Sequence, residues 1–174
     1  MSLLVDPPWG LGQTLGVSST SDGTGWVGAV KEFTDVNPTT GVIRSNRRKI
    51  CVAVRNTSGG ALLPKKVVKF DVSTTGAAVL GAVSADNTTA NAGFVGVVDE
   101  YLPTAGVSAN DVFWITVEGP TEVIANGAVT AGAAISTVTT AGRIDDGGSL
   151  TIGHALAAAS TGGDEILASV NTLR

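Results

Sequence analysis

The chain has 174 residues, a formal net charge of −4 at neutral pH, and only 15% charged and 5% aromatic residues. Glycine, alanine, valine and threonine make up more than half of it, while the usual helix formers are scarce. Valine and threonine favour strands, and abundant glycine favours tight turns. This composition excludes a helical bundle, a coiled coil and a charged disordered tail, and it argues against an α/β enzyme with long amphipathic helices.

Residues 1–49 are predicted to form an extended N-terminal arm with one or two strands. Residues 1–24 are rich in glycine, serine and threonine. We therefore expect them to lack regular structure, with Trp9 as an apolar anchor. Residues 26–36 alternate in places and predict a strand, which a turn at residues 37–41 ends. A second strand is predicted over residues 42–56, where apolar residues alternate from Ile50 onward.

Residues 50–174 are predicted to form an all-β domain, a small β-barrel or a β-tulip. Turn signals recur there at intervals of about 8–12 residues, which is typical of barrels and sandwiches. We expect a polar loop at residues 84–93, a turn at Gly119 and Pro120, and a hairpin turn at Asn126 and Gly127. The remaining strands are predicted at residues 67–72, 77–83, 94–98, 112–118, 121–125, 133–139, 142–145, 150–155 and 165–171.

The net charge conceals an uneven distribution. Residues 1–70 carry a net charge of +5, and residues 71–174 carry −9. Such an asymmetry predicts a partner of opposite charge, either nucleic acid or an acidic protein surface, including the acidic half of a neighbouring copy. We do not expect nucleic acid, because no aromatic residue between Phe33 and Phe70 offers a stacking platform beside the basic run. The densest part of that run contains Arg44, Arg47, Arg48 and Lys49.

The residue pattern assembles no catalytic constellation, and we predict no enzyme activity. The only histidine, His154, lies in a strand pattern and lacks a nucleophile-elbow motif, so a half-buried strand histidine is expected. Asp145 and Asp146 indicate a turn rather than a calcium loop. Asp99 and Glu100 are adjacent, so on a strand they would face opposite sides.

The cysteine and histidine counts also limit the chemistry. A single cysteine, Cys51, excludes a disulfide within the chain, and it is expected to be a packed strand thiol. Cys51 and His154 cannot form a zinc site without carboxylates, so we predict no metal and no cofactor. The chain has no apolar run of about 18 residues, so we expect no membrane partner. Its first residues lack the features of a secretory signal, so cytoplasmic synthesis is expected.

Several short segments between Val52 and Asn171 carry a resemblance to a known family. In their order, they resemble the head decoration, or capsid cement, proteins of tailed bacteriophages. The segments are AVRNTSGGALLP at 53–64, FVGVV at 94–98, VEG at 117–119, ANGAVTAG at 125–132, IGHAL at 152–156 and GDEILA at 163–168.

The resemblance implies a small β-barrel or β-tulip core that binds outside an assembled shell and often clusters as a trimer. We therefore expect a structural virion protein on the outer capsid surface, with the major capsid protein and its own homotrimer as partners. The alternative is a carbohydrate-binding or adhesive β-domain on a virion or cell surface. A sugar site would need exposed aromatic residues, and Tyr101 and Trp114 are the candidates near loops.

We expect the N-terminal region to make the capsid contact. An extended arm can add a strand to an exposed sheet edge of a partner. Trp9 and Trp26 would be its anchors, since they are predicted to lie away from the core. In the alternative, the arm wraps its own trimer. The basic residues expected to face an acidic capsid surface are Arg44, Arg47, Arg48 and Lys49.

Overall fold

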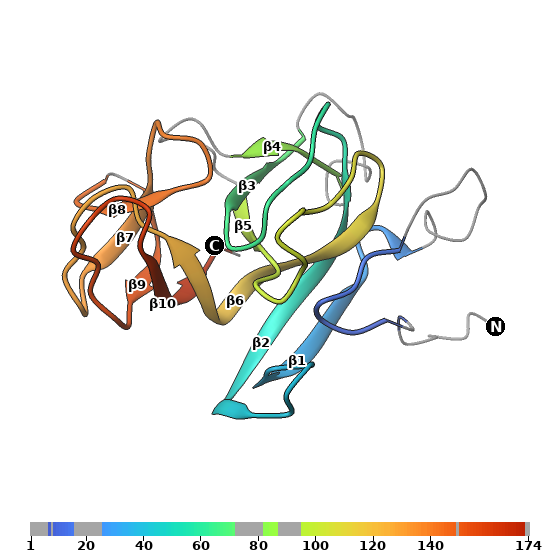
Figure 1. The fold of residues 1–174 in the computed structure, drawn as a ribbon, viewed down its shortest axis with the longest axis horizontal. Coiled ribbons are helices and arrows are strands. Elements are labelled where there is room, and N and C mark those ends of the chain that lie inside the picture. The colour runs from blue at the N-terminus through green and yellow to red at the C-terminus, as the bar shows by residue number, and fades with distance from the viewer. Residues whose placement is uncertain are drawn as a thin grey trace.

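The computed structural model describes residues 7, 9–15, 26–71, 82–86, 95–148 and 150–172, and this part of the chain is all-β, as predicted (Figure 1). No α-helix occurs among these residues. The strands are β1 (Val30–Val36), β2 (Ile43–Asn56), β3 (Val67–Phe70), β4 (Ala82–Asp86), β5 (Val95–Val98), β6 (Val112–Ile124), β7 (Ala134–Thr137), β8 (Ile144–Asp146), β9 (Thr151–Ala155) and β10 (Glu165–Asn171).

The strands form one sheet in the order β1-β2-β4-β3-β5-β6-β10-β9-β7-β8. All pairings are antiparallel except that of β2 with β4. The sheet as a whole is not closed into a barrel, because β1 and β8 stand at its two ends. An additional pairing of β2 with β6 folds the sheet back on itself, so that β2, β4, β3, β5 and β6 pair in a ring.

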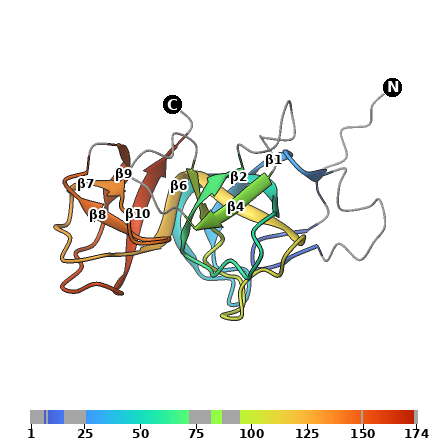
Figure 2. The same ribbon diagram turned by 90° about the horizontal axis from the view of Figure 1, so that it is seen from above.

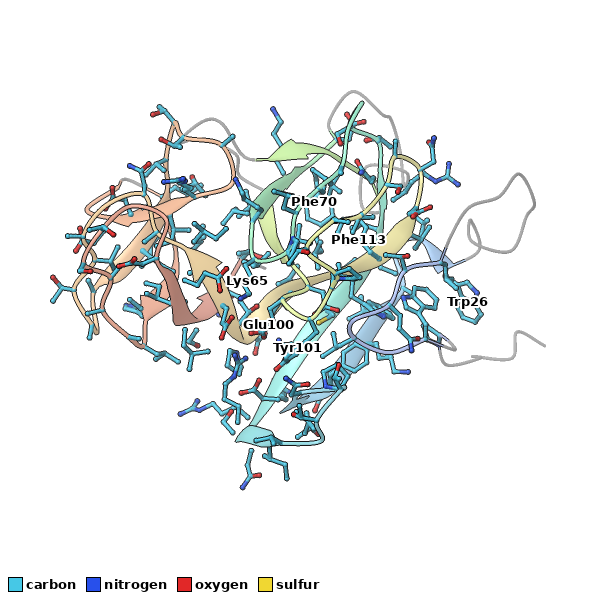
Figure 3. The ribbon with its side chains drawn as sticks, viewed as in Figure 1. Trp26, Lys65, Phe70, Glu100, Tyr101 and Phe113 are labelled. Atoms are coloured by element: carbon cyan, nitrogen blue, oxygen red, sulfur yellow. The ribbon has the colours of Figure 1, made fainter. Side chains whose placement is uncertain are left out.

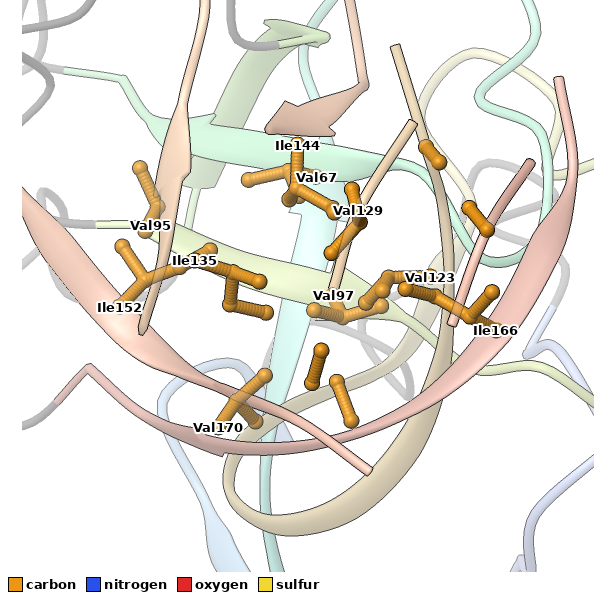
Figure 4. Packing of buried hydrophobic residues seen from close by; sticks show 14 residues of the cluster. Val67, Val95, Val97, Val123, Val129, Ile135, Ile144, Ile152, Ile166 and Val170 are labelled. Carbon is orange, nitrogen blue, oxygen red and sulfur yellow. The ribbon is translucent and has the colours of Figure 1, made fainter. Parts of the chain in front are cut away.

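The long strand β6 joins two lobes, which Figures 1 and 2 show on either side of it. Its first half pairs with β2 and β5, and its second half pairs with β10. The lobe of β7–β10 encloses a core of valine, isoleucine and alanine side chains, shown in Figure 4, to which β3 and β5 contribute Val67, Val95 and Val97. A second core, with Phe113 and Ile115 at its centre, fills the ring.

Most predicted strands are confirmed, but one strand boundary and two turns are wrong. Asp86 ends β4 inside the segment expected to be a polar loop, while residues 72–81 and 87–94, including Phe94, lie outside the described residues. The expected turn at Gly119 and Pro120 does not form, because β6 continues through both residues as it changes partner from β2 to β10. The expected hairpin at Asn126 and Gly127 is also absent, since β10 rather than β7 pairs with the end of β6.

The expected division of the chain at residues 49 and 50 falls inside β2, which pairs with β1 and β6 on both sides of that point. The first strand of the predicted arm is therefore part of the same sheet as the rest of the chain.

Gly119 allows β2 and β6 to approach each other closely. Its φ is +105°, and a Cβ atom placed there would lie 2.4 Å from the carbonyl oxygen of Arg48. We expect Gly119→Ala to lower the free energy of unfolding by about 2 kcal/mol or more, through backbone strain and this clash. Chemical denaturation would measure the loss.

The control is Gly59→Ala, because Gly59 has open space around its Cβ position. We expect this variant to change the free energy of unfolding by no more than about 0.5 kcal/mol. Equal losses in the two variants would contradict the close-approach argument.

Candidate binding surface

The β1–β2 hairpin projects from the rest of the molecule (Figure 1). Its turn is held by Asn37, whose Oδ1 accepts hydrogen bonds from the backbone N–H groups of Thr39 at 2.9 Å and Thr40 at 3.1 Å. Two apolar side chains lie exposed at the tip: Val42 is 62% exposed and Ile43 is 60% exposed. An ordered, projecting tip with exposed apolar side chains is a candidate contact surface.

The basic run lies on β2 just after this tip, where the strand is irregular. Thr34 pairs with Arg48, and the next residue of β1, Asp35, pairs with Ser45. Residues 46 and 47 therefore have no partner in β1, and they form a bulge on β2. Bulges redirect side chains, and here both Arg47 and Arg48 are exposed.

Two members of the basic run point inward and form a buried ionic cluster. The Lys49 side chain is fully buried, and its Nζ lies 2.5 Å from Oε1 of Glu100. Arg44 Nη2 lies 2.7 Å from Oδ1 of Asp35, and Arg44 Nη1 lies 2.7 Å from Oε2 of Glu100. Ser45 completes the shell by donating its hydroxyl to Asp35 at 2.8 Å. The cluster ties the hairpin, from Asp35 and Arg44 near its tip to Lys49 further along β2, to the loop after β5.

The charges of this cluster stabilise one another against burial. Burial by itself would raise the pKa of Glu100, but the hydrogen bond from Arg44 and the positive charge of Lys49 bring it below its ordinary value. Burial likewise opposes the charge of Arg44, and its hydrogen bonds to Glu100 and Asp35 nevertheless raise its pKa. Burial raises the pKa of the neighbouring Asp99, although the backbone N–H groups of Gly12 and Tyr101 donate to it.

The surface beside Arg47 is hollowed on both sides. One hollow, of about 380 Å³, lies between Arg47, Arg48, Glu118 and residues 169–171 of β10. The other, of about 220 Å³, has Arg44 and Ser45 on one wall and the apolar side chains of Leu156 and Leu167 on the other. Arg47 and Ser169 line both. No ion pair of the Arg47 guanidinium is found among the described residues, so its charge faces these hollows.

The predicted contact residues are therefore divided by the structure. Arg47 and Arg48 are exposed, and among the described residues the ion pairs of Arg48 are long, at 3.6 Å to Glu32 and to Glu118. Arg44 is half-buried and Lys49 is fully buried in the ionic cluster, so neither side chain presents a free charge to a partner. The chain itself supplies the carboxylates for these two side chains. The capsid contact of the basic run stays a prediction, for which Arg47 and Arg48 are the exposed members.

The expectation that Trp9 and Trp26 lie away from the core is also wrong. Trp9 is only 4% exposed, and its ring stacks on that of Trp114 with centroids 4.9 Å apart. Trp26 meets Trp9 edge to face at 6.2 Å and is half-buried. Leu15 pairs with Val112 at the start of β6. The described part of the arm thus docks on its own chain, because its few apolar residues cover an apolar face of β2 and β6.

Sequence reasoning missed Glu100 as the centre of the cluster. The sequence treats Glu100 as a strand residue, where it and Asp99 would face opposite sides. Both residues instead follow β5, which ends at Val98, and both are buried. Figure 3 shows Glu100 and Tyr101 where the hairpin meets the rest of the sheet. Two features of the sequence could have indicated this cluster. Asp99 and Glu100 directly follow a continuous apolar strand, and a basic run that becomes buried requires nearby carboxylates to pair with it.

The other reactive side chains stand apart from one another. Cys51 is a free, buried thiol, as predicted, and burial raises its pKa to about 12. His154 lies on β9 but is exposed rather than half-buried. Asp145 and Asp146 lie in β8 instead of a turn, and they accept hydrogen bonds from Asn126 and from the backbone N–H of Thr130.

Within the described ranges, no group of three or more histidine, cysteine, aspartate or glutamate side chains is arranged to hold a metal ion. In that same part of the chain, no helix has the length and apolar character needed to cross a membrane.

Neither a family model nor a curated protein sequence matches the chain. Among solved structures, the chain is similar to the N base of the head fiber gp8.5 of bacteriophage phi29. The two share 15% sequence identity with a TM-score of 0.46, over 71% of this chain and 95% of that chain. We draw no functional conclusion from a likeness of this extent.

Proposed function

We propose that this chain is a non-enzymatic structural protein of a tailed-bacteriophage virion, which binds the outside of the capsid and cements neighbouring major capsid subunits. The phage context comes from the sequence resemblance. The observation that carries the binding role is the projecting β1–β2 hairpin, which presents Val42 at its tip and the free charge of Arg47 behind it.

The hairpin is suited to bind a preformed surface with little ordering cost. Asn37 holds its turn, and the ionic cluster of Lys49, Glu100 and Arg44 holds the hairpin to the loop after β5. A contact that is ordered before binding loses less side-chain and loop entropy on association. Many copies on one lattice then convert modest individual contacts into a strong clamp. A protein that binds only the assembled shell stabilises that shell by mass action.

The carbohydrate-binding alternative relies on exposed aromatic residues near loops. Trp114 is fully buried beneath Trp9, and Tyr101 lies under the ammonium group of Lys49, 5.2 Å from Nζ to the ring centroid. Trp114 is closed to a sugar and Lys49 occupies one face of Tyr101, so we do not propose this function.

The test is binding to empty capsids of the encoding phage that have been prepared without this protein. Val42→Ser together with Arg47→Ala is expected to weaken co-sedimentation tenfold or more, since the pair removes the apolar contact and the free charge. The arginine contribution should decrease as salt is raised. Controls are Leu63→Ser and Lys69→Ala, because Leu63 is 41% exposed and neither residue is on the hairpin. Unchanged binding of the hairpin variant would overturn the proposed contact.

We also propose that the protein acts as a homo-oligomer. The expected trimer stays a prediction, which a mass measurement in solution will decide.

A further inference from the structure

The outer edge of β1 has no partner strand among the described residues. β1 stands at one end of the sheet and pairs only with β2. Ala53 donates its N–H to the carbonyl of Ala29, and Asn37 donates to Val42. Along an antiparallel strand, residues whose N–H and C=O groups bond to one neighbouring strand alternate with residues whose N–H and C=O groups point to the opposite edge. The N–H and C=O groups of Val30, Glu32, Thr34 and Val36 therefore point to the free edge.

This edge has the regular spacing that another strand requires. The extra residues at the irregular positions of the hairpin, such as 46 and 47, belong to β2 and not to β1. β1, with the sequence VKEFTDV, contains no proline. Edges of natural sheets are usually protected by proline, by bulges, by charged side chains or by a covering segment. In the part of the chain that is described, β1 has no proline and no bulge of its own. Two of its three charged side chains bond within the chain, since Lys31 donates to the carbonyl of Pro7 and Asp35 pairs with Arg44.

The two ends of the hairpin also expose apolar side chains on one face. Val30, at the start of β1, is 63% exposed, and Ile43, the Cα partner of Val36 at its end, is 60% exposed. Val30 in turn has Val52 of β2 as its partner. Directly opposed residues of an antiparallel pair share a face of the sheet. Val30 and Ile43 therefore lie on the same face but at opposite ends of the strand.

A second copy of the same strand satisfies these features together. If two β1 strands pair antiparallel about Phe33, Val30 of each copy comes opposite Val36 of the other. A row of directly opposed apolar side chains then crosses the four strands. It consists of Ile43 and Val36 of one copy, followed by Val30 and Val52 of the other. Two-fold symmetry forms this row twice and places Val30 of each copy beside Val36 of the other. The same register places Glu32 opposite Thr34 and Lys31 opposite Asp35, so no like charges meet. A slip of the pairing centre by one residue towards the N-terminus would place Glu32 opposite Glu32.

We propose that β1 is a self-association surface, at which two copies of the chain pair antiparallel about Phe33 and form one continuous sheet. A single free edge accepts one partner, so this contact produces a two-fold dimer and not a ring of three. The expected trimer would require a different surface. The inference does not depend on the proposed capsid role.

The first test is disulfide trapping in the absence of capsids. Directly opposed hydrogen-bonded residues lie about 5.5 Å apart between Cα atoms, which a disulfide spans. An oxidised mixture of the Glu32→Cys and Thr34→Cys proteins should therefore form a crosslinked dimer between the two variants, and neither protein should crosslink alone. The native thiol, Cys51, is buried and does not compete. Crosslinking of Glu32→Cys with itself would overturn the proposed register.

The second test is the mass of the full chain as a function of concentration, by sedimentation equilibrium. The unmodified chain should shift from monomer to dimer, and Val30→Lys should weaken the dimer tenfold or more, because it places a charge in the apolar row. Val42→Lys is the matched control, since Val42 is 62% exposed but lies outside the row. A monomer at every concentration would overturn the proposal, as would equal effects of the two lysines. An unmodified chain that dimerises but does not bind capsids would count against the proposed function alone.

Discussion

Replacing Glu100 by glutamine should lower the free energy of unfolding by about 3–5 kcal/mol, because the substitution leaves the ammonium group of Lys49 buried without its counter-charge. Lys49 is fully buried, and its Nζ lies 2.5 Å from Oε1 of Glu100. Removing one partner of a buried pair is costly, since the remaining charge still bears the cost of leaving water. Urea denaturation of the purified variant would measure the change.

Two further variants separate this effect from a general loss of acidic charge. Glu122→Gln removes a carboxylate that is 37% exposed, 2.8 Å from Lys65 and 3.8 Å from Arg44. Lys65 keeps Glu165 as a partner and Arg44 keeps Asp35 and Glu100, so the substitution should cost less than about 1 kcal/mol. Lys49→Met combined with Glu100→Gln should recover part of the loss, because it removes the buried charge as well. A double variant no more stable than Glu100→Gln would contradict the assignment of the loss to Lys49.

The same cluster predicts a dependence on acid pH. The pKa of Glu100 is lower in the folded chain than its ordinary value, which represents the unfolded chain. Its contribution is therefore fully present above that ordinary value, and it is lost as the pH falls through the lower folded value. The raised pKa of Asp99 has the opposite sign, so its protonation offsets part of the loss. The acid-dependent loss should be smaller in Glu100→Gln.

Replacing Trp9 by alanine should also lower the free energy of unfolding, by about 3–5 kcal/mol, which is typical of a buried tryptophan. The ring is 4% exposed and stacks on Trp114, so its removal leaves a cavity on the face of β2 and β6. Thermal denaturation followed by near-ultraviolet circular dichroism would record both the loss and the changed environment of Trp114.

The matched variant is Trp26→Ala, because Trp26 touches the same cluster only edge to face and is half-buried. It should cost clearly less than Trp9→Ala. The original interpretation of Trp9 as a capsid anchor makes a different prediction, in which Trp9→Ala weakens capsid binding and leaves the unfolding free energy unchanged. That outcome would contradict the packing described above.

Local patterns predicted the strands well wherever alternation was strong. Residues 165–171 were predicted as a strand and form β10 with the same bounds, because apolar residues alternate there with polar ones. Gly119 and Pro120 show the limit of this reasoning. Their residue types favour a turn in isolation, but the strands on either side of β6 hold both residues in one extended strand.

The basic residues predicted to contact the capsid show more strongly that local pattern does not decide tertiary contacts. The spacing of the four basic residues does not indicate which of them are exposed. Arg47 and Arg48 are exposed, whereas Arg44 and Lys49 form ion pairs inside the protein. The distinction depends on the bulge at residues 46 and 47 and on a carboxylate, Glu100, that is distant in the sequence. Trp9 likewise has its partner, Trp114, in a strand more than half the chain away.

The sequence by itself determined that this chain is all-β, that its cysteine is a packed thiol, and where most strands begin and end. Composition and alternation are local properties, and they act through backbone preference and the burial of one face of each strand. Only the tertiary structure decided that β6 joins two lobes, that the described part of the arm packs on its own chain, and that Lys49 is neutralised by Glu100. These features depend on contacts between distant segments, whose free energies arise from burial and charge pairing once the sheet has formed.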